Sequence, residues 1–251
     1  MHFVIVGSGS KGNATILFSH GTTILIDLGL PLIRVKEGLQ LLNKTIKDVD
    51  GVIYTHEHSD HINGLKSFSP KIMYATEGTL PGSLSNRVEY YEPFTIKNLK
   101  ITPFPTSHDA KKPCGYVIES EDEKFVYFTD SGVFVEEALP LLTNPDYLMI
   151  ESNHDVARLM HTNRPMNLKM RILSQHGHLC NEDSAFAASK IVGNKTKEVI
   201  LAHLSEEANT PELALEAYRN VFSYCGLLFD RYHIRCAPQW NCMEGGNLDE
   251  N

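Results

Sequence analysis

The feature that most constrains this chain is a run of metal-binding residue types directly after a short apolar segment. Residues 55–61 read THEHSDH, and the preceding segment Val52–Tyr54 is predicted to be a buried strand. Imidazole and carboxylate groups are the donors that zinc, manganese and iron take in proteins. His56 and His58 lie two apart at a strand end, so their side chains can point to the same side. The sequence therefore predicts a metal site at the end of a strand.

Further donors are needed because a single metal ion takes about four ligands. The candidates His108, Asp130 and His203 follow three more predicted strands, where loops commonly present functional groups from a rigid scaffold. A lone histidine at such a place is more often structural or exposed, but the cluster at residues 56–61 favours ligation. The complete set of candidate ligands is His56, His58, Asp60, His61, His108, Asp130 and His203.

The order of the predicted elements indicates the fold class. Short strands dominate the first half of the chain, and from about residue 132 helices alternate with strands. This order predicts an α+β fold in which two sheets lie between helical layers, a four-layer αββα sandwich. The strands are expected at 2–7, 14–19, 22–29, 52–54, 71–75, 99–104, 115–119, 124–129, 147–150 and 198–202.

Capping residues locate the predicted helices. A helix over 182–192 has Asn181 as its expected N-cap and Gly193 as its C′ residue, and one over 211–222 begins after Thr210. Two more helices are expected at 32–42 and 134–142. No linker divides the chain, so residues 1–238 are predicted to be a single domain. Residues 239–251 are polar with two adjacent glycines and are predicted to be a flexible tail.

Composition limits the partners and the compartment. With 31 acidic and 23 basic side chains the net charge is −8, which argues against a nonspecific nucleic-acid coat and leaves a local cleft for any DNA. Five cysteines without a CxxC pair support neither a zinc ribbon nor a disulfide framework, which indicates a reducing, cytoplasmic location. We find no secretory signal and no membrane-spanning stretch, so we expect no membrane partner.

The pattern HxHxDH, followed by a spaced His, Asp and His, resembles the metallo-β-lactamase superfamily from about residue 3 to residue 203. This resemblance implies two divalent ions, without deciding between zinc, manganese and iron. It also implies that Asp27 is a buried acid that orients a metal-binding histidine, although a turn aspartate is the simpler alternative. The implied ligands are His56, His58 and His108 for the first ion, Asp60, His61 and His203 for the second, and Asp130 as a bridge.

Four short segments narrow the resemblance. GSGSKGN at 7–13, ESNHD at 151–155, GHLCN at 177–181 and HLSEEANTPE at 203–212 are similar to the YycJ/WalJ subgroup over nearly the whole chain. The subgroup implies a dinuclear-metal-dependent hydrolase, most simply a phosphodiesterase or exonuclease that degrades duplex DNA from the 5′ end, with a suggested role in DNA repair. One departure is Cys180, which stands where the subgroup is expected to have serine.

Weaker signals concern the substrate. Ser8, Ser10 and Asn13 could contact a phosphate, but GSGSKGN lacks the GK[ST] of a P-loop and a tight turn is the simpler interpretation. His154 and His178 could bind the substrate phosphate or protonate the leaving group, or could be ordinary polar histidines. Asp60 could serve both as a ligand and as a proton acceptor.

Other functions stay open at this point. The same scaffold could hydrolyse a small ester, a lactone, a thioester or a cyclic phosphodiester. A redox member of the superfamily would normally carry a flavin module, for which the chain has no room. From a different class, the chain could be a non-catalytic metal-binding protein, but a structural zinc site closes with four ligands and does not need seven.

Overall fold

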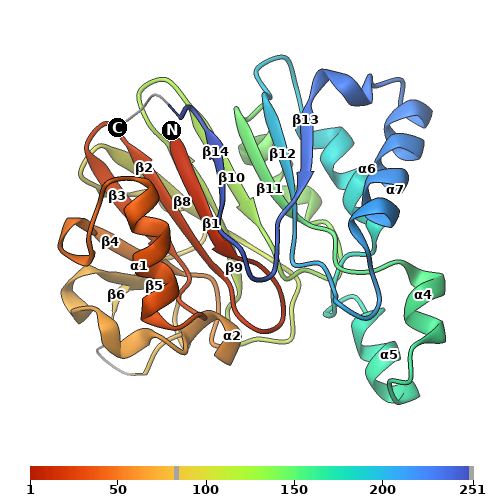
Figure 1. The fold of residues 1–251 in the computed structure, drawn as a ribbon, viewed down its shortest axis with the longest axis horizontal. Coiled ribbons are helices and arrows are strands. Elements are labelled where there is room, and N and C mark those ends of the chain that lie inside the picture. The colour runs from red at the N-terminus through yellow and green to blue at the C-terminus, as the bar shows by residue number, and fades with distance from the viewer. Residues whose placement is uncertain (82–84, 249–251) are drawn as a thin grey trace. The chain divides into compact units, whose positions relative to one another are not determined.

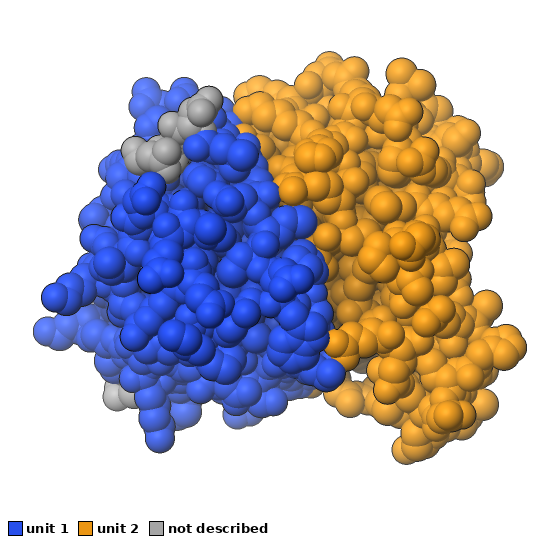
Figure 2. Space-filling view, viewed as in Figure 1, with its two compact units in different colours: residues 1–104, 110–124, 238–251 blue, residues 105–109, 125–237 orange. Residues whose placement is uncertain are grey.

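The computed structural model describes residues 1–81 and 85–248 and divides the chain into two compact units. The first unit contains residues 1–104, 110–124 and 238–251, and the second contains residues 105–109 and 125–237, as coloured in Figure 2. The assignment of residues 1–238 to a single domain stays a prediction. In the described part of the chain, no helix is both long enough and apolar enough to cross a bilayer.

The first unit is built on a seven-stranded sheet in the order β14-β1-β2-β3-β4-β5-β6 (Figure 1). Its antiparallel part is β14 (Met243–Gly246), β1 (His2–Gly7), β2 (Ala14–Ser19) and β3 (Thr22–Ile26), and its parallel part continues from β3 through β4 (Gly51–Tyr54), β5 (Met73–Ala75) and β6 (Asn86–Arg87). All residues of β1–β4 are buried, which agrees with their near-continuous apolar sequence.

A helix covers this sheet. α1 (Leu32–Leu41) places Val35 and Leu39 in a core cluster with residues of β1 and β2. Gly38 allows the close approach, because a Cβ there would lie 2.8 Å from side-chain atoms of both Ile16 and Val6. The unit also contains the short helix α2 (Ser59–Ile62) and three further strands, β7 (Phe94–Ile96), β8 (Leu99–Pro105) and β9 (Cys114–Glu119). Pro105 at the end of β8 belongs to the second unit.

The predicted tail is partly a strand, so the prediction of a flexible segment is wrong for residues 243–246. β14 pairs with β1, with His2 opposite Gly246 and Ile5 opposite Met243. The low hydrophobicity of this segment was misleading because pairing at a sheet edge uses backbone N–H and C=O groups, which nearly every residue has. Residues 249–251 lie outside the described part of the chain.

The second unit contains four parallel strands in the order β10-β11-β12-β13. Their carboxyl ends meet at one edge, since Phe128 pairs with Ile150 and Glu151 pairs with Ala202. Asp130, Glu151 and His203 therefore lie at the same edge of this sheet. The strands are β10 (Lys124–Phe128), β11 (Tyr147–Glu151), β12 (Glu198–Ala202) and β13 (His233–Cys236).

The helices of the second unit are α3 (Leu139–Leu142), α4 (Val156–His161), α5 (Met166–Ile172), α6 (Asn181–Ile191) and α7 (Pro211–Tyr224). α7 begins as predicted, with the Thr210 hydroxyl accepting a hydrogen bond from the backbone N–H of Leu213 at 3.3 Å. The helix predicted over 134–142 is shorter, because a 3₁₀ turn at Glu136–Ala138 precedes α3, which has its proline in the first turn.

The predicted N-cap of α6 is wrong, whereas Gly193 occupies the predicted C′ position after the C-cap Val192. Its N-cap is Cys180, whose Sγ accepts from the backbone N–H of Asp183 at 3.4 Å. The side chain of Asn181 is instead buried, accepting from Ser152 Oγ at 2.7 Å and donating to Asn209 Oδ1 at 2.9 Å. At the other end Val192 takes extended backbone angles (φ −63°, ψ 151°) and ends the helix. Gly193 is therefore not a left-handed cap.

Replacing Cys180 with serine is expected to stabilise the fold by about 0.5–1 kcal/mol, because a hydroxyl is a better N-cap acceptor than a thiol. A chain of this length should then unfold about 1–4 °C higher in a thermal melt. Cys225→Ser, at the exposed end of α7, is the matched control and should leave the melting temperature unchanged. An unchanged or lower melting temperature for Cys180→Ser would contradict the capping argument.

Candidate metal centre

Strand ends in both units carry candidate site residues on strained backbone. Asp27 after β3, Asp130 after β10 and His203 after β12 have φ values of 59°, 55° and 55°. This left-handed region is unfavourable for residues other than glycine and persists where the surrounding structure over-determines it, often at functional sites. Each of these residues follows the carboxyl end of a buried strand, and its polar side chain is itself buried.

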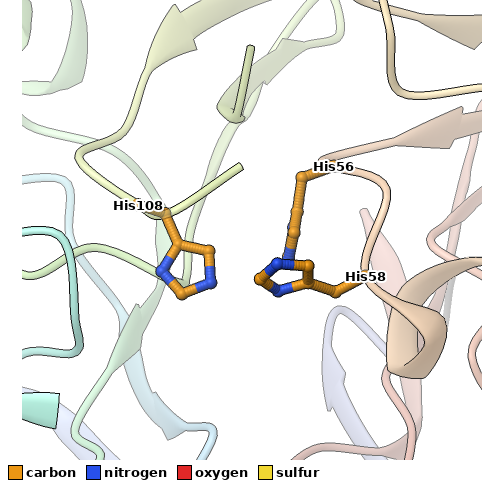
Figure 3. A group of neighbouring side chains, drawn as sticks. All are labelled: His56, His58 and His108. Atoms are coloured by element: carbon orange, nitrogen blue, oxygen red, sulfur yellow. The ribbon is translucent and has the colours of Figure 1, made fainter. Parts of the chain in front are cut away.

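In the first unit, three imidazoles gather at the end of β4. The rings of His56 and His58 have their centroids 4.6 Å apart, and those of His56 and His61 lie 4.1 Å apart. Figure 3 labels His56 and His58, which extend from the loop between β4 and α2, and His108, which belongs to the second unit. α2 begins directly after His58 and carries Asp60 and His61.

Asp27 lies beneath this cluster, as an orienting acid would. It is fully buried, and its Oδ2 accepts from His61 Nδ1–H at 2.8 Å. The other oxygen, Oδ1, accepts from the backbone N–H of Thr55 at 2.8 Å, and the Thr55 hydroxyl lies 3.0 Å from His56 Nδ1. Since His61 donates through Nδ1, its Nε2 carries the lone pair that a metal ion needs.

The glycine-rich loop at residues 7–13 holds the ligand side chains. Asn13 is buried, its backbone N–H donates to Asp60 O at 2.8 Å, and its Nδ2 lies 3.1 Å from His61 Nε2 and 3.4 Å from Asp60 Oδ2. Gly29 allows Asp60 to approach, because a Cβ there would lie 1.6 Å from Asp60 O. Ser8 is buried and donates its N–H to Pro238 O, whereas Ser10 is exposed. Contact of Ser8, Ser10 and Asn13 with a substrate stays a prediction.

A cavity of about 600 Å³ opens in the first unit beside the histidine loop. Its wall includes Glu57, which lies between His56 and His58 in the chain, and Lys111, whose backbone N–H donates to Glu57 Oε1 at 2.9 Å. Polar and basic side chains complete one side of the cavity, namely Thr76, Thr79 and Arg87. This volume is in the range of small-molecule and cofactor sites.

In the second unit, His108 is positioned by the backbone of a distant loop. Its Nδ1–H donates to the carbonyl oxygen of Gly177 at 3.0 Å, so the lone pair lies on Nε2. Burial lowers the pKa of His108, which keeps the ring neutral near pH 7 as ligation requires. His108 Nε2 lies 4.0 Å from Asp130 Oδ1, and the rings of His108 and His178 have centroids 5.0 Å apart.

Glu151 is the functional residue that sequence reasoning did not single out. Its Oε1 accepts from Nδ1 of both His178, at 2.7 Å, and His203, at 2.9 Å. Its Oε2 accepts from the backbone N–H groups of Ser131, at 3.0 Å, and Leu179, at 3.2 Å. Glu151 therefore accepts a hydrogen bond from Nδ1 of His203 as Asp27 does from Nδ1 of His61. An acid at the end of a predicted buried strand, the signal used for Asp130, could have identified it.

The charge of Glu151 follows from these contacts. Burial alone would raise the pKa of Glu151, but the charges and hydrogen bonds of His178 and His203 outweigh burial and hold that pKa well below its usual range. An ionised Glu151 fixes Nδ1 of both histidines as protonated and leaves their Nε2 atoms as the possible ligands. Asp130, whose Oδ1 lies 3.4 Å from His203 Nδ1, completes this cluster. Donor atoms of Asp130, Glu151, His178 and His203 lie within 4.8 Å of one another.

The two histidines considered for catalysis lie in different surroundings. The side chain of His178 is 21% exposed. His154 is only 1% exposed, and neither ring nitrogen has a hydrogen-bond partner among the described residues. Burial lowers the pKa of His154 to about 4, so its ring is neutral at physiological pH. A role for either histidine in proton transfer stays a prediction, with His178 the more accessible of the two.

The donor set of each unit suits borderline divalent ions. The first unit offers His56, His58, Asp60 and His61, and the second offers His108, Asp130 and His203. In each unit a buried carboxylate accepts a hydrogen bond from an imidazole Nδ1 and so fixes the tautomer of that ring. Such imidazoles are usual ligands of these ions. The residues present therefore fit divalent metals of the zinc, manganese or iron type.

Comparison with known proteins places this arrangement in a family. The model of the β-lactamase superfamily domain matches residues 22–204, a span that includes all seven candidate ligands. In solved structures, the metallo-β-lactamase fold protein YhfI from Bacillus subtilis matches 97% of this chain and 99% of its own, with a TM-score of 0.71 and 17% identity. This similarity confirms the predicted αββα sandwich.

Curated relatives narrow the family further. The exodeoxyribonuclease WalJ of Streptococcus pneumoniae serotype 2 (strain D39 / NCTC 7466) is 36% identical over 227 residues, 84% of each chain. The exodeoxyribonuclease YycJ of Bacillus anthracis is 34% identical over 227 residues, 85% of this chain and 86% of the relative. The chain therefore belongs to the β-lactamase superfamily and, within it, to the family of the exodeoxyribonucleases WalJ and YycJ.

Proposed function

We propose that this protein is a metal-dependent exonuclease that hydrolyses the phosphodiester bonds of DNA from an end. The observation that carries the proposal is the pair of imidazole sets at strand ends, each fixed by a buried carboxylate, in a chain whose relatives are named exodeoxyribonucleases. The proposal also includes three more specific points: the enzyme degrades duplex DNA from the 5′ end, takes part in DNA repair and is located in the cytoplasm.

The seven ligands together hold two divalent ions in this proposal. His56, His58 and His108 would hold the first ion, Asp60, His61 and His203 would hold the second, and Asp130 would contact both. Support comes from the donor types of these residues, because imidazole and carboxylate groups suit divalent ions of the zinc, manganese or iron type. When bound, the ions would supply Lewis-acid charge and lower the pKa of a water molecule.

The remaining chemistry is assigned to the side chains around these ligands. Asp60, half-buried and 3.5 Å from His61 Nε2, accepts the proton of the attacking water. His178 holds the scissile phosphate or delivers a proton to the departing oxygen, and the ionised Glu151 stabilises its imidazolium form. The cavity beside Glu57 provides room for part of a nucleotide, with Lys111 and Arg87 in its wall. DNA then binds in a local cleft, despite the net charge of −8.

An assay on several substrates tests the proposal. The full chain, loaded with Mn²⁺, Zn²⁺ or Fe²⁺, is offered end-labelled linear duplex DNA, closed circular duplex, bis(p-nitrophenyl) phosphate and a lactone. We expect nucleotides to be released from the linear duplex while the closed circle stays intact. His178→Ala should slow this release by about 10²–10⁴-fold if the side chain transfers a proton. Rapid lactone hydrolysis without loss of DNA would replace the nuclease with the small-ester alternative.

Metal analysis of the same preparation tests the dinuclear site separately. Protein purified without chelator should contain close to two divalent ions per chain. A reproducible value near zero, in folded protein to which the ions have been offered back, would contradict the dinuclear assignment and favour another function for the cluster.

A further inference from the structure

An exposed tryptophan lies beside the glycine-rich loop of the first unit. Trp240 is the sole tryptophan of the sequence, and it is 49% exposed. Its segment precedes β14 and packs on the loop at residues 7–13: Ser8 N–H donates to Pro238 O at 3.1 Å, and a Cβ at Gly9 would lie 2.0 Å from Gln239 Oε1. The loop and the tryptophan segment are therefore held together by close backbone and side-chain contacts.

Two basic side chains accompany the indole. Lys11 Nζ lies 5.3 Å from the centroid of the Trp240 ring, within the range of a cation–π contact. Arg34 of α1 donates from Nη2 to the carbonyl oxygen of Trp240, and its Nη1 lies 3.1 Å from Glu37 Oε2. An aromatic face with basic side chains near it is a combination with which proteins bind single-stranded nucleic acid, because bases stack on the ring and phosphates meet the charges.

The loop connects this surface to the metal ligands within the same unit. Lys11 is two residues before Asn13, whose side chain lies against both His61 and Asp60. Two residues of extended chain span at most about 7 Å, so the Lys11 backbone lies within that distance of the Asn13 backbone. The loop that contacts the candidate ligands Asp60 and His61 therefore also carries the lysine that lies over the indole.

We propose that Trp240, with Lys11 and Arg34, is a stacking site for an unpaired base near the end of the DNA strand. This inference rests on the proposed function and names the form of the substrate: a strand end whose bases are unstacked. Inside a duplex both faces of a base are covered by its neighbours, so the indole can stack on a base other than the terminal one only after that base has left the stack. Ends with unpaired bases therefore offer more stacking partners than blunt ends. Specificity for sequence is not expected, because every base has an aromatic face.

The single tryptophan makes the test direct. Metal-loaded full-length protein is titrated with oligonucleotides whose terminal linkages are phosphorothioates to slow hydrolysis: a blunt duplex, a duplex with a single-stranded 5′ end, and a single strand. Indole emission should be quenched in a saturable manner, most by the two forms with unpaired ends. Trp240→Leu should weaken their binding by about 5- to 100-fold, and Trp240→Phe by less. Lys11→Gln should reduce the salt dependence of binding by about one phosphate contact.

One control variant and two possible outcomes test the stacking site. Tyr224→Leu removes the aromatic side chain at the end of α7, which is 84% exposed, and should leave DNA binding and turnover unchanged. Circular dichroism and metal content establish that Trp240→Leu is folded and loaded. If the parent protein cleaves DNA but Trp240→Leu binds every oligonucleotide as tightly, the stacking site is refuted and the nuclease function stands. If the parent neither binds nor cleaves DNA, the proposed function fails and this inference fails with it.

Discussion

Replacing Asp130 with asparagine is expected to lower the rate of DNA hydrolysis by on the order of 10³-fold or more. Loss of a hydrogen-bond partner of a metal ligand typically costs about 10–100-fold in metal affinity or activity. Loss of Asp130 should cost more, because in the proposed site it would contact both ions. Asparagine keeps the size of the side chain and the left-handed backbone at this position, since it tolerates φ near 55°. Turnover on end-labelled duplex and the number of bound ions measure the effect.

The control is another buried aspartate of the second unit. Asp146 precedes β11, at the end of the sheet opposite Asp130, and its Oδ1 lies 3.2 Å from Lys197 Nζ. Asp146→Asn removes a carboxylate charge without touching a candidate ligand, so turnover should stay near that of the parent. Full turnover by Asp130→Asn at limiting metal would show that Asp130 does not bridge the ions.

Replacing Glu151 with glutamine should cost about 10–100-fold in metal affinity and in turnover, although the residue is not proposed as a ligand. A glutamine has one acceptor oxygen where Glu151 uses both, so it cannot satisfy His178, His203 and the backbone N–H groups of Ser131 and Leu179 together. An imidazole that loses its Nδ1 hydrogen bond can rotate or change tautomer, and its Nε2 then no longer has the orientation that ligation needs. Metal titration of chelator-treated protein, followed by kinetics at saturating metal, separates affinity from turnover.

Glu198 is the matched control for this change. It is buried near the amino end of β12, where it pairs with Arg235, and register places it opposite Tyr147, at the other end of the sheet from Glu151. Glu198→Gln can lower stability through the lost ion pair, but metal affinity should not change. Equal metal affinity in Glu151→Gln and the parent would mean that the histidines keep their orientation without the carboxylate, and the orienting role would be wrong.

The sequence by itself determined the buried apolar strands and indicated the candidate ligands. Apolar runs such as His2–Gly7 and Glu198–Ala202 appear as β1 and β12 with the predicted bounds, because burial of both faces leaves a local signature. The candidate ligands were readable for a similar reason: THEHSDH concentrates donors within seven positions, and His108, Asp130 and His203 each follow such a run. In both cases the determining interactions lie within a few residues along the chain.

Only the tertiary structure decided how these residues are supported. Glu151 joins His178, 27 positions away, to His203, 52 positions away, and no local pattern encodes a carboxylate shared between them. β14 exists because β1 offers it an unpaired edge, and Asn181 leaves the cap of α6 to Cys180 because buried Ser152 and Asn209 bind its side chain. Hydrogen bonds between distant segments depend on which groups the fold brings within 3 Å, and local sequence patterns do not carry that information.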